Sequence, residues 1–207
     1  MKMKKALLVL CVLALAVGSV FGTLAYLTDA DSNTNTFTVG SVQIKLDEAD
    51  VNEDGTLASE DRVIENTYHL LPGHTYIKDP TIHVSDDSEG CYLFVKVENG
   101  IAAIETKEAG KTIAEQMKAL NWVPVDGVPN VYVLAKGEAD KHAVFYGAEV
   151  VVFNNFTIDG GSVDNDTLKA YEGKTVVVTA YAVQMDGFED HTPEQIWDTV
   201  FSGAANP

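Results

Sequence analysis

One acidic stretch of the sequence has side chains spaced as ligands for a calcium ion. Oxygen-bearing side chains stand at its first, third, fifth and twelfth positions and a glycine at its sixth: Asp50, Asn52, Asp54, Asp61 and Gly55. Calcium loops of the EF-hand type use this spacing, because the glycine permits a sharp turn that directs several oxygens at one ion. The backbone carbonyl of Thr56 would supply a further ligand. The stretch therefore predicts a calcium site.

A second interpretation of the same stretch needs no ion. The closing residue is Asp61, which is shorter than the glutamate that usually binds calcium through both oxygens. The residues before Asp50 have the alternation of a strand, whereas a helix precedes an EF-hand loop. Residues 47–65 would then be a solvated acidic insertion between two strands. Both interpretations stay open at this point, and calcium is the one cofactor that the sequence suggests.

Other side chains that could support catalysis lack the necessary spacing. The histidines include no His-Glu-x-x-His pair, which would place two imidazoles on one helical face: His69, His74, His83, His142 and His191. No Gly-x-Ser-x-Gly sequence occurs. Cys91 lies in an apolar run, where a small core residue is expected rather than a reactive thiolate. We therefore expect a protein that is not an enzyme.

The N-terminus has the pattern of a secretory signal peptide. Three lysines in the first five residues precede an apolar run over residues 6–20, and small residues follow at Thr23 and Ala25. We expect cleavage after Ala25, so that Tyr26 becomes the new N-terminus. The alternative is a retained membrane anchor, because residues 6–27 carry no charge and are long enough to span a bilayer.

The chain is strongly acidic beyond this leader. It has 31 acidic and 14 basic residues and a formal net charge of −17, and every acidic residue lies after residue 25. Such a charge repels nucleic acid and anionic membrane surfaces, so we expect neither as a partner after cleavage. We expect a secreted protein, located in the extracellular matrix or at the cell surface, that meets a signal peptidase during export.

Residues 26–207 predict a single, mostly β domain. Alternating or β-branched runs between clusters of Gly, Asn and Asp predict strands over residues 36–46, 76–84, 92–97, 131–134, 142–146, 150–158 and 175–183. Capping boxes predict two short helices over residues 112–120 and 192–200. Pro80 favours an edge strand or an irregular strand entry. The expected fold is an antiparallel β-sandwich or jelly roll that follows a signal-peptide helix.

Three parts of the chain resemble one family of secreted proteins. They read Gly-Thr-Leu-Ala-Tyr-Leu-Thr-Asp at 22–29 with Asn-Thr-Phe-Thr-Val-Gly-Ser-Val-Gln-Ile at 35–44, Leu-Pro-Gly-His-Thr-Tyr-Ile-Lys-Asp-Pro at 71–80, and Ala-Tyr-Ala-Val-Gln-Met-Asp-Gly-Phe at 180–188. These stretches resemble the TasA and camelysin family of biofilm-matrix and spore-coat-associated proteins of Gram-positive bacteria. Members of this family are exported through a dedicated SipW-type signal peptidase.

The resemblance implies a jelly-roll fold and a subunit that assembles into extracellular fibres or binds other matrix and cell-surface proteins. In such fibres the N-terminal segment of one subunit can pair with the sheet of the next. The candidate donor segment here is Tyr26–Val39, whose apolar residues are Tyr26, Leu27, Phe37 and Val39. The alternative for this segment is an ordinary N-terminus that leads into the first strand.

Two other functions compete with a self-assembling matrix protein. One is a monomeric surface adhesin or binding module that calcium stabilises. The other is a metalloprotease, an activity that the resemblance to camelysin implies but that the spacing of the histidines does not support.

Overall fold

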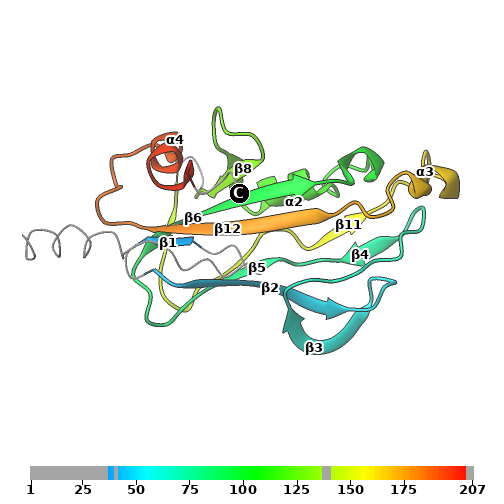
Figure 1. The fold of residues 1–207 in the computed structure, drawn as a ribbon, viewed down its shortest axis with the longest axis horizontal. Helices are drawn as coiled ribbons and strands as arrows, with labels where there is room; N and C mark the ends of the chain where they lie inside the picture. The colour runs from blue at the N-terminus through cyan, green and yellow to red at the C-terminus, as the bar shows by residue number, and fades with distance from the viewer. Residues whose placement is uncertain (1–36, 40–41, 137–140, 204–207) are drawn as a thin grey trace, which may run out of the picture. The chain divides into compact units, whose positions relative to one another are not determined.

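The computed structural model describes residues 37–39, 42–136 and 141–203, which all belong to the second of the two units of the chain, residues 34–207. The described residues are mostly β, with three short α-helices (Figure 1). The strands are β1 (Phe37–Val39), β2 (Ile44–Val51), β3 (Leu57–Val63), β4 (Thr75–Ile77), β5 (Thr81–Val84), β6 (Cys91–Asn99), β7 (Trp122–Pro124), β8 (Val131–Leu134), β9 (Ala143–Val144), β10 (Glu149–Val151), β11 (Asn155–Thr157) and β12 (Val176–Gln184).

These strands form two larger sheets and one pair. The first sheet has the order β1-β12-β6-β8-β7, and β9 also pairs with β6. The second sheet has the order β10-β5-β2-β3, and β11 pairs with β4. Pairing is antiparallel throughout these described strands except between β1 and β12. The longest ladder joins β6 to β12, from Asn99 opposite Val176 to Cys91 opposite Gln184.

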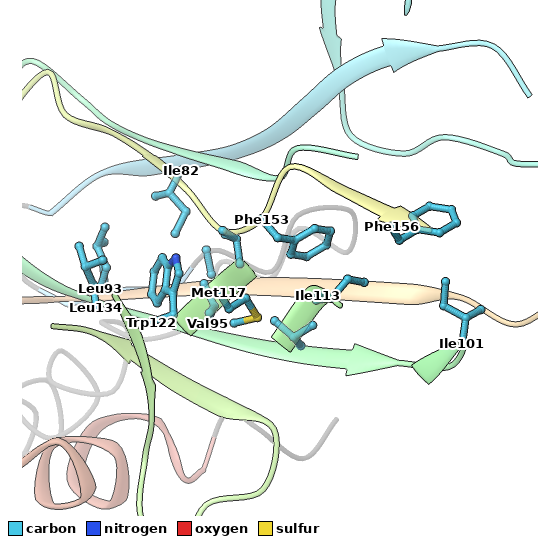
Figure 2. Packing of buried hydrophobic residues seen from close by; sticks show 14 of the residues in the cluster. Ile82, Leu93, Val95, Ile101, Ile113, Met117, Trp122, Leu134, Phe153 and Phe156 are labelled. Atoms are coloured by element: carbon cyan, nitrogen blue, oxygen red, sulfur yellow. The ribbon is translucent and has the colours of Figure 1, made fainter. Parts of the chain in front are cut away.

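One apolar cluster contains side chains from both larger sheets (Figure 2). Alternate residues of β6 enter it, namely Cys91, Leu93, Val95 and Val97, and β5 contributes Ile82 and Val84. Helix α2 (Ile113–Ala119) adds Ile113 and Met117 next to the indole of Trp122. The indole N–H donates to the carbonyl of Val151 at 3.0 Å, so burial leaves no unpaired donor on this ring.

A second apolar cluster covers the opposite face of the first sheet. Tyr92 and Phe94 of β6 lie in it with Tyr181 of β12, and the C-terminal helical segment contributes Ile196, Trp197 and Phe201. The Tyr181 and Trp197 rings meet edge to face with centroids 5.0 Å apart. Both faces of the first sheet are therefore buried, which explains why β6 is a continuous apolar run rather than an alternating one.

Both helices expected from capping boxes are confirmed. Thr112 and Glu115 cap α2 reciprocally, and Thr192 and Gln195 do the same for α4 (Pro193–Ile196), which continues as the π-helical turn η2 (Trp197–Phe201). The short elements η1 (Ala102–Ile104) and α3 (Asn165–Lys169) were not predicted. The Asp164 side chain caps α3 by accepting from the N–H of Thr167.

The acidic stretch 47–65 is a β-hairpin rather than an insertion between strands. β2 continues to Val51, the chain turns at residues 52–56, and β3 returns alongside as an edge strand of the second sheet. The sequence did not indicate β3, because most of its side chains are exposed and it lacks apolar alternation. The three-residue edge strand β7 was missed as well.

Three of the expected strands are each divided between two strands of the structure. Residues 36–46 divide between β1 and β2, which belong to different sheets. The strand expected over residues 76–84 is divided into β4 and β5, with Pro80 in the gap and its carbonyl accepting from the N–H of Val152 at 2.8 Å. The irregular entry predicted at Pro80 is confirmed, whereas the edge position is wrong, since β5 lies between β10 and β2. Residues 150–158 likewise divide between β10 and β11.

A buried carboxylate fixes the start of α2. Glu105 is 5% exposed, and its side chain accepts from the backbone N–H of Ile113 at 2.7 Å and from the side-chain amide of Asn99. The helix N-terminus presents unpaired N–H groups that favour a negative charge. This carboxylate therefore holds α2 against the strand that ends at Asn99.

We expect Glu105→Ala to lower the free energy of unfolding by about 2 kcal/mol, because the N–H of Ile113 and the Asn99 amide would lose a charged acceptor while buried. Urea denaturation followed by circular dichroism measures this change. The matched control is Glu108→Ala, at an exposed position paired only with Lys111, which should cost less than about 0.5 kcal/mol. Equal effects of the two substitutions would contradict the role assigned to Glu105.

Candidate functional site

The predicted calcium ligands lie on the β2–β3 hairpin. At its tip the N–H of Asn52 donates to the carbonyl of Thr56 at 2.9 Å, and the N–H of Gly55 donates to the carbonyl of Asn52 at 2.8 Å. Gly55 has φ of +80°, and a Cβ there would lie 2.7 Å from Cα of Tyr76. The tip is thus a tight turn packed against β4, and its glycine serves that contact.

Three of the five predicted ligands, Asp50, Asp54 and Thr56, already accept hydrogen bonds within the hairpin through the oxygens that would bind calcium. Asp50 accepts from the hydroxyl of Ser59 at 3.0 Å, and Asp54 Oδ1 accepts from the N–H and hydroxyl of Thr56 at 3.0 and 2.6 Å. The side-chain hydroxyl of Thr56, followed by its N–H, lowers the pKa of Asp54 below the ordinary value. The carbonyl of Thr56 is held by Asn52, as described above.

The hairpin brings Asn52, Asp54 and Thr56 together at its tip and places Asp50 and Asp61 on its two strands. Asp61 lies next to Arg62, at the shift in register between the two strands. An EF-hand loop, by contrast, wraps its ligands around the ion with no strand pairing between its first and last positions. Calcium binding here stays a prediction. It requires that some of these oxygens give up their hydrogen bonds and bind the ion instead.

Asp47 is the centre of an ion cluster on the second sheet. Ile44 and Leu46 of β2 pack against the first apolar cluster, and Asp47 follows with its side chain only 3% exposed. The carboxylate contacts Nζ of Lys45 at 2.9 Å, Nε2 of His83 at 2.8 Å and Nε of Arg62. These contacts connect β2 to its neighbours β5 and β3 in the sheet.

The Asp47 cluster extends to two further carboxylates. Arg62 also contacts Asp79 Oδ2 at 3.0 Å, and Nδ1 of His83 lies 3.3 Å from Oε1 of Glu149 on β10. Burial alone would raise the pKa of Asp47, but hydrogen bonds from Arg62, Lys45 and His83 outweigh it and hold the pKa below its ordinary value. Asp47 is therefore ionised in the folded protein, and the cluster joins all strands of the second sheet.

The described end of the candidate donor segment forms an edge strand. β1 runs parallel to β12, with Phe37 opposite Tyr181, Thr38 opposite Ala182 and Val39 opposite Val183 (Figure 1). It pairs with three of the nine residues of β12, whose other edge pairs with β6 over its whole length. The remaining predicted residues, Tyr26 and Leu27, and the expected cleavage site at Ala25, lie outside the described residues.

The residues considered for catalysis lie in separate environments. His83 belongs to the Asp47 cluster. The ring centroid of His74 lies 6.4 Å from that of Tyr76, and the ring centroid of His191 lies 5.3 Å from that of Phe188. Over residues 37–39, 42–136 and 141–203, no group of three or more His, Cys, Asp or Glu side chains is placed to hold a metal ion. Cys91 is fully buried, and burial raises the pKa of its thiol to about 12, which confirms a core residue.

Comparison of the chain with protein-family models, with curated proteins and with solved structures gives no match. In the part of the chain that the structure describes, no helix is long and apolar enough to cross a membrane. The residues themselves must therefore carry any functional argument.

A calcium titration separates the two interpretations of the hairpin. We expect isothermal calorimetry to give weak heats that are equal for the wild type and for Asp50→Ala/Asp54→Ala, because Ser59 and Thr56 already donate to these carboxylates. A saturable heat in the wild type that disappears in the double variant would instead establish the calcium site.

The Asp47 cluster predicts a dependence of stability on pH. The pKa of Asp47 is lower in the folded than in the unfolded chain, so its contribution is complete above the unfolded value of about 4 and is lost as the pH falls further. We expect Asp47→Asn to cost about 3 kcal/mol at pH 6 and clearly less at pH 3, in urea unfolding at each pH. Asp87→Asn, at an exposed position, supplies the baseline. An Asp47→Asn cost that does not change with pH would show that the carboxylate charge is not what matters.

Proposed function

We propose that this chain is a secreted structural protein of an extracellular matrix, whose subunits associate through the edges of their β-sheets outside the cell. The observation that carries the proposal is the position of β1, which closes one edge of the first sheet through three residue pairs. β1 follows residues 26–36, which would become the new N-terminus after signal-peptide cleavage. Export and the exposure of an assembly segment would thus be one event.

The described fold supports a β-sandwich of the jelly-roll type. The two larger sheets share one apolar cluster, and the helical segment α4–η2 covers the other face of the first sheet. Since both of its faces are covered, the first sheet can gain a partner strand only at its edges. This arrangement agrees with the resemblance to the TasA and camelysin family, in which subunits form fibres.

Strand exchange provides the physical route for assembly. A short edge strand contributes few hydrogen bonds to its own subunit, so the same segment of a second copy can replace it at small cost. Each subunit would offer β1 to the next and receive one at β12. A reciprocal exchange between two copies would close on a dimer, whereas the proposed exchange passes from each copy to the next and extends into a filament. Loss of the three leader lysines changes the formal net charge from −17 to −20, and divalent cations would reduce the repulsion between such subunits.

Two alternative functions predict different behaviour in solution. A monomeric surface adhesin stabilised by calcium would sediment as a monomer with or without the ion. A metalloprotease of the camelysin type would cleave peptides, and the activity would be lost with one of the histidines. Assembly predicts polymers and no such activity.

We expect the mature protein, beginning at Tyr26, to form polymers that sediment rapidly and appear as fibres in electron microscopy. The double variant Phe37→Pro/Thr38→Pro removes two adjacent backbone N–H groups from β1, so that at least one hydrogen bond to β12 is lost whichever residue donates. We expect this variant to remain monomeric while its circular dichroism stays that of the wild type.

The matched control changes two exposed apolar residues at an edge of the second sheet, on and just after β3, with Leu57→Ser and Ile64→Ser. These changes leave β1 intact, so the control should form polymers like the wild type. Polymers from the proline variant, or monomers from the wild type, would exclude assembly through β1.

A further inference from the structure

A second buried carboxylate lies one residue after Asp47 and has a different environment. Glu48 is 4% exposed and, by the alternation of β2, lies on the same face as Ile44 and Leu46, which pack against the first apolar cluster. Its Oε2 contacts Nζ of Lys78, whose side chain is 11% exposed. Its Oε1 accepts a hydrogen bond from Nδ2 of Asn66 at 2.9 Å. Glu48 thus contacts an amine through one carboxylate oxygen and a carboxamide through the other.

The Asn66 amide is held in one orientation by the backbone of β2. Its Oδ1 accepts from the N–H of Val51 at 3.0 Å, and its Nδ2 donates to the carbonyl of Ala49 at 2.8 Å as well as to Glu48. The N–H of Val51 polarises the carbonyl, as a donor in an oxyanion hole does. The amide nitrogen faces the carboxylate that could protonate it as it leaves.

An aromatic side chain shields this group from water. Nζ of Lys78 lies 5.9 Å from the centroid of the Tyr68 ring, and the Tyr68 hydroxyl donates to the carbonyl of Ile77 at 3.0 Å. Burial, followed by the negative charges of Glu48 and Asp79, raises the pKa of Tyr68 well above its ordinary value. Once Glu48 has taken its proton, the Lys78 amine is a poorly solvated nucleophile, because its side chain is only 11% exposed.

We propose that Lys78 and Asn66 join in an intramolecular amide cross-link that Glu48 promotes. Glu48 takes a proton from the Lys78 ammonium, and the free amine Nζ attacks Cγ of Asn66. The new Nζ–Cγ bond forms, and Glu48 returns the proton to Nδ2. The Cγ–Nδ2 bond then breaks and releases ammonia, and the Glu48 carboxylate takes the second proton of Nζ and passes it to water, which leaves a neutral amide. The reaction involves no oxidation or reduction and needs no cofactor.

Folding supplies what this reaction needs. Amines and carboxamides do not condense at a useful rate in water, but two groups fixed against one carboxylate react at a high effective concentration. The cross-link would tie the chain just after β3 to the residue between β4 and β5, closing residues 66–78 into a ring. This cross-link is independent of the proposed assembly, since it lies within one subunit and away from β1.

Mass spectrometry of the mature protein tests the cross-link directly. We expect the intact mass to be lower by one ammonia than the sequence requires. Trypsin cuts after lysine and arginine, and residues 63–78 contain no such residue before Lys78. A cross-linked Lys78 resists cleavage, so the denatured protein should yield residues 63–96 as one peptide, lower by one ammonia. A cyclised asparagine elsewhere also loses ammonia but leaves Lys78 open to trypsin.

Three variants complete the test. Lys78→Arg keeps the cation beside Glu48 without a reactive amine, and Glu48→Gln removes the base, so both should have the full sequence mass. Lys45→Arg changes a lysine that forms an ion pair with Asp47 and takes no part in the cross-link, so this control should keep the lower mass. We expect the melting temperature of Lys78→Arg to be about 10 °C below that of the wild type, because the closed ring restricts the unfolded chain. Release of residues 63–78 at full mass from the wild type would overturn the proposal.

Discussion

The rest of the structure depends on the burial of the first sheet on both faces. β6 and β12 form its longest ladder, and their side chains alternate between a cluster shared with the second sheet and a cluster covered by the C-terminal helical segment. A sheet covered in this way excludes water from its backbone hydrogen bonds, and it has no free face for a partner. Another strand can therefore pair with this sheet only at its edges. The proposed assembly accordingly depends on the edge strand β1 and not on a cleft.

The second sheet is stabilised differently, with charges inside a mostly apolar structure. Asp47 and Glu48 are neighbours in the sequence, and the alternation of β2 directs them to opposite faces, where each meets its own cations. A buried carboxylate is costly unless it is paired and fully hydrogen-bonded, and both of these are. Arg62 on β3 and Lys78 between β4 and β5 supply partners for them and connect β2 to neighbouring parts of the chain. In the proposed extracellular role such fixed contacts would add durability, and the proposed covalent link would add more.

Much of the first sheet could be predicted from the sequence, because its strands are apolar and end in turn residues. The two capped helices were also predictable, since Thr112 with Glu115 and Thr192 with Gln195 are local signals. The polar strand β3 could not be, because its pairing depends on β2 and on Arg62 reaching Asp47. The same holds for Glu48, Asn66 and Lys78. They are far apart in the sequence, and only the register of β2 and the turn at residues 72–73 bring Asn66 and Lys78 to Glu48.

The most direct test of assembly by strand exchange asks whose β12 each β1 contacts in the polymer. Thr38 and Ala182 are opposite each other, so Thr38→Cys/Ala182→Cys should form a disulfide across this pair, while Cys91 is buried and unreactive. Exchange of β1 between subunits predicts that oxidation of the polymers joins different subunits, which gives a ladder of covalent oligomers on a non-reducing gel. Oxidised polymers that run only as monomers on this gel would show that each β1 stays in its own subunit, and would contradict assembly by strand exchange.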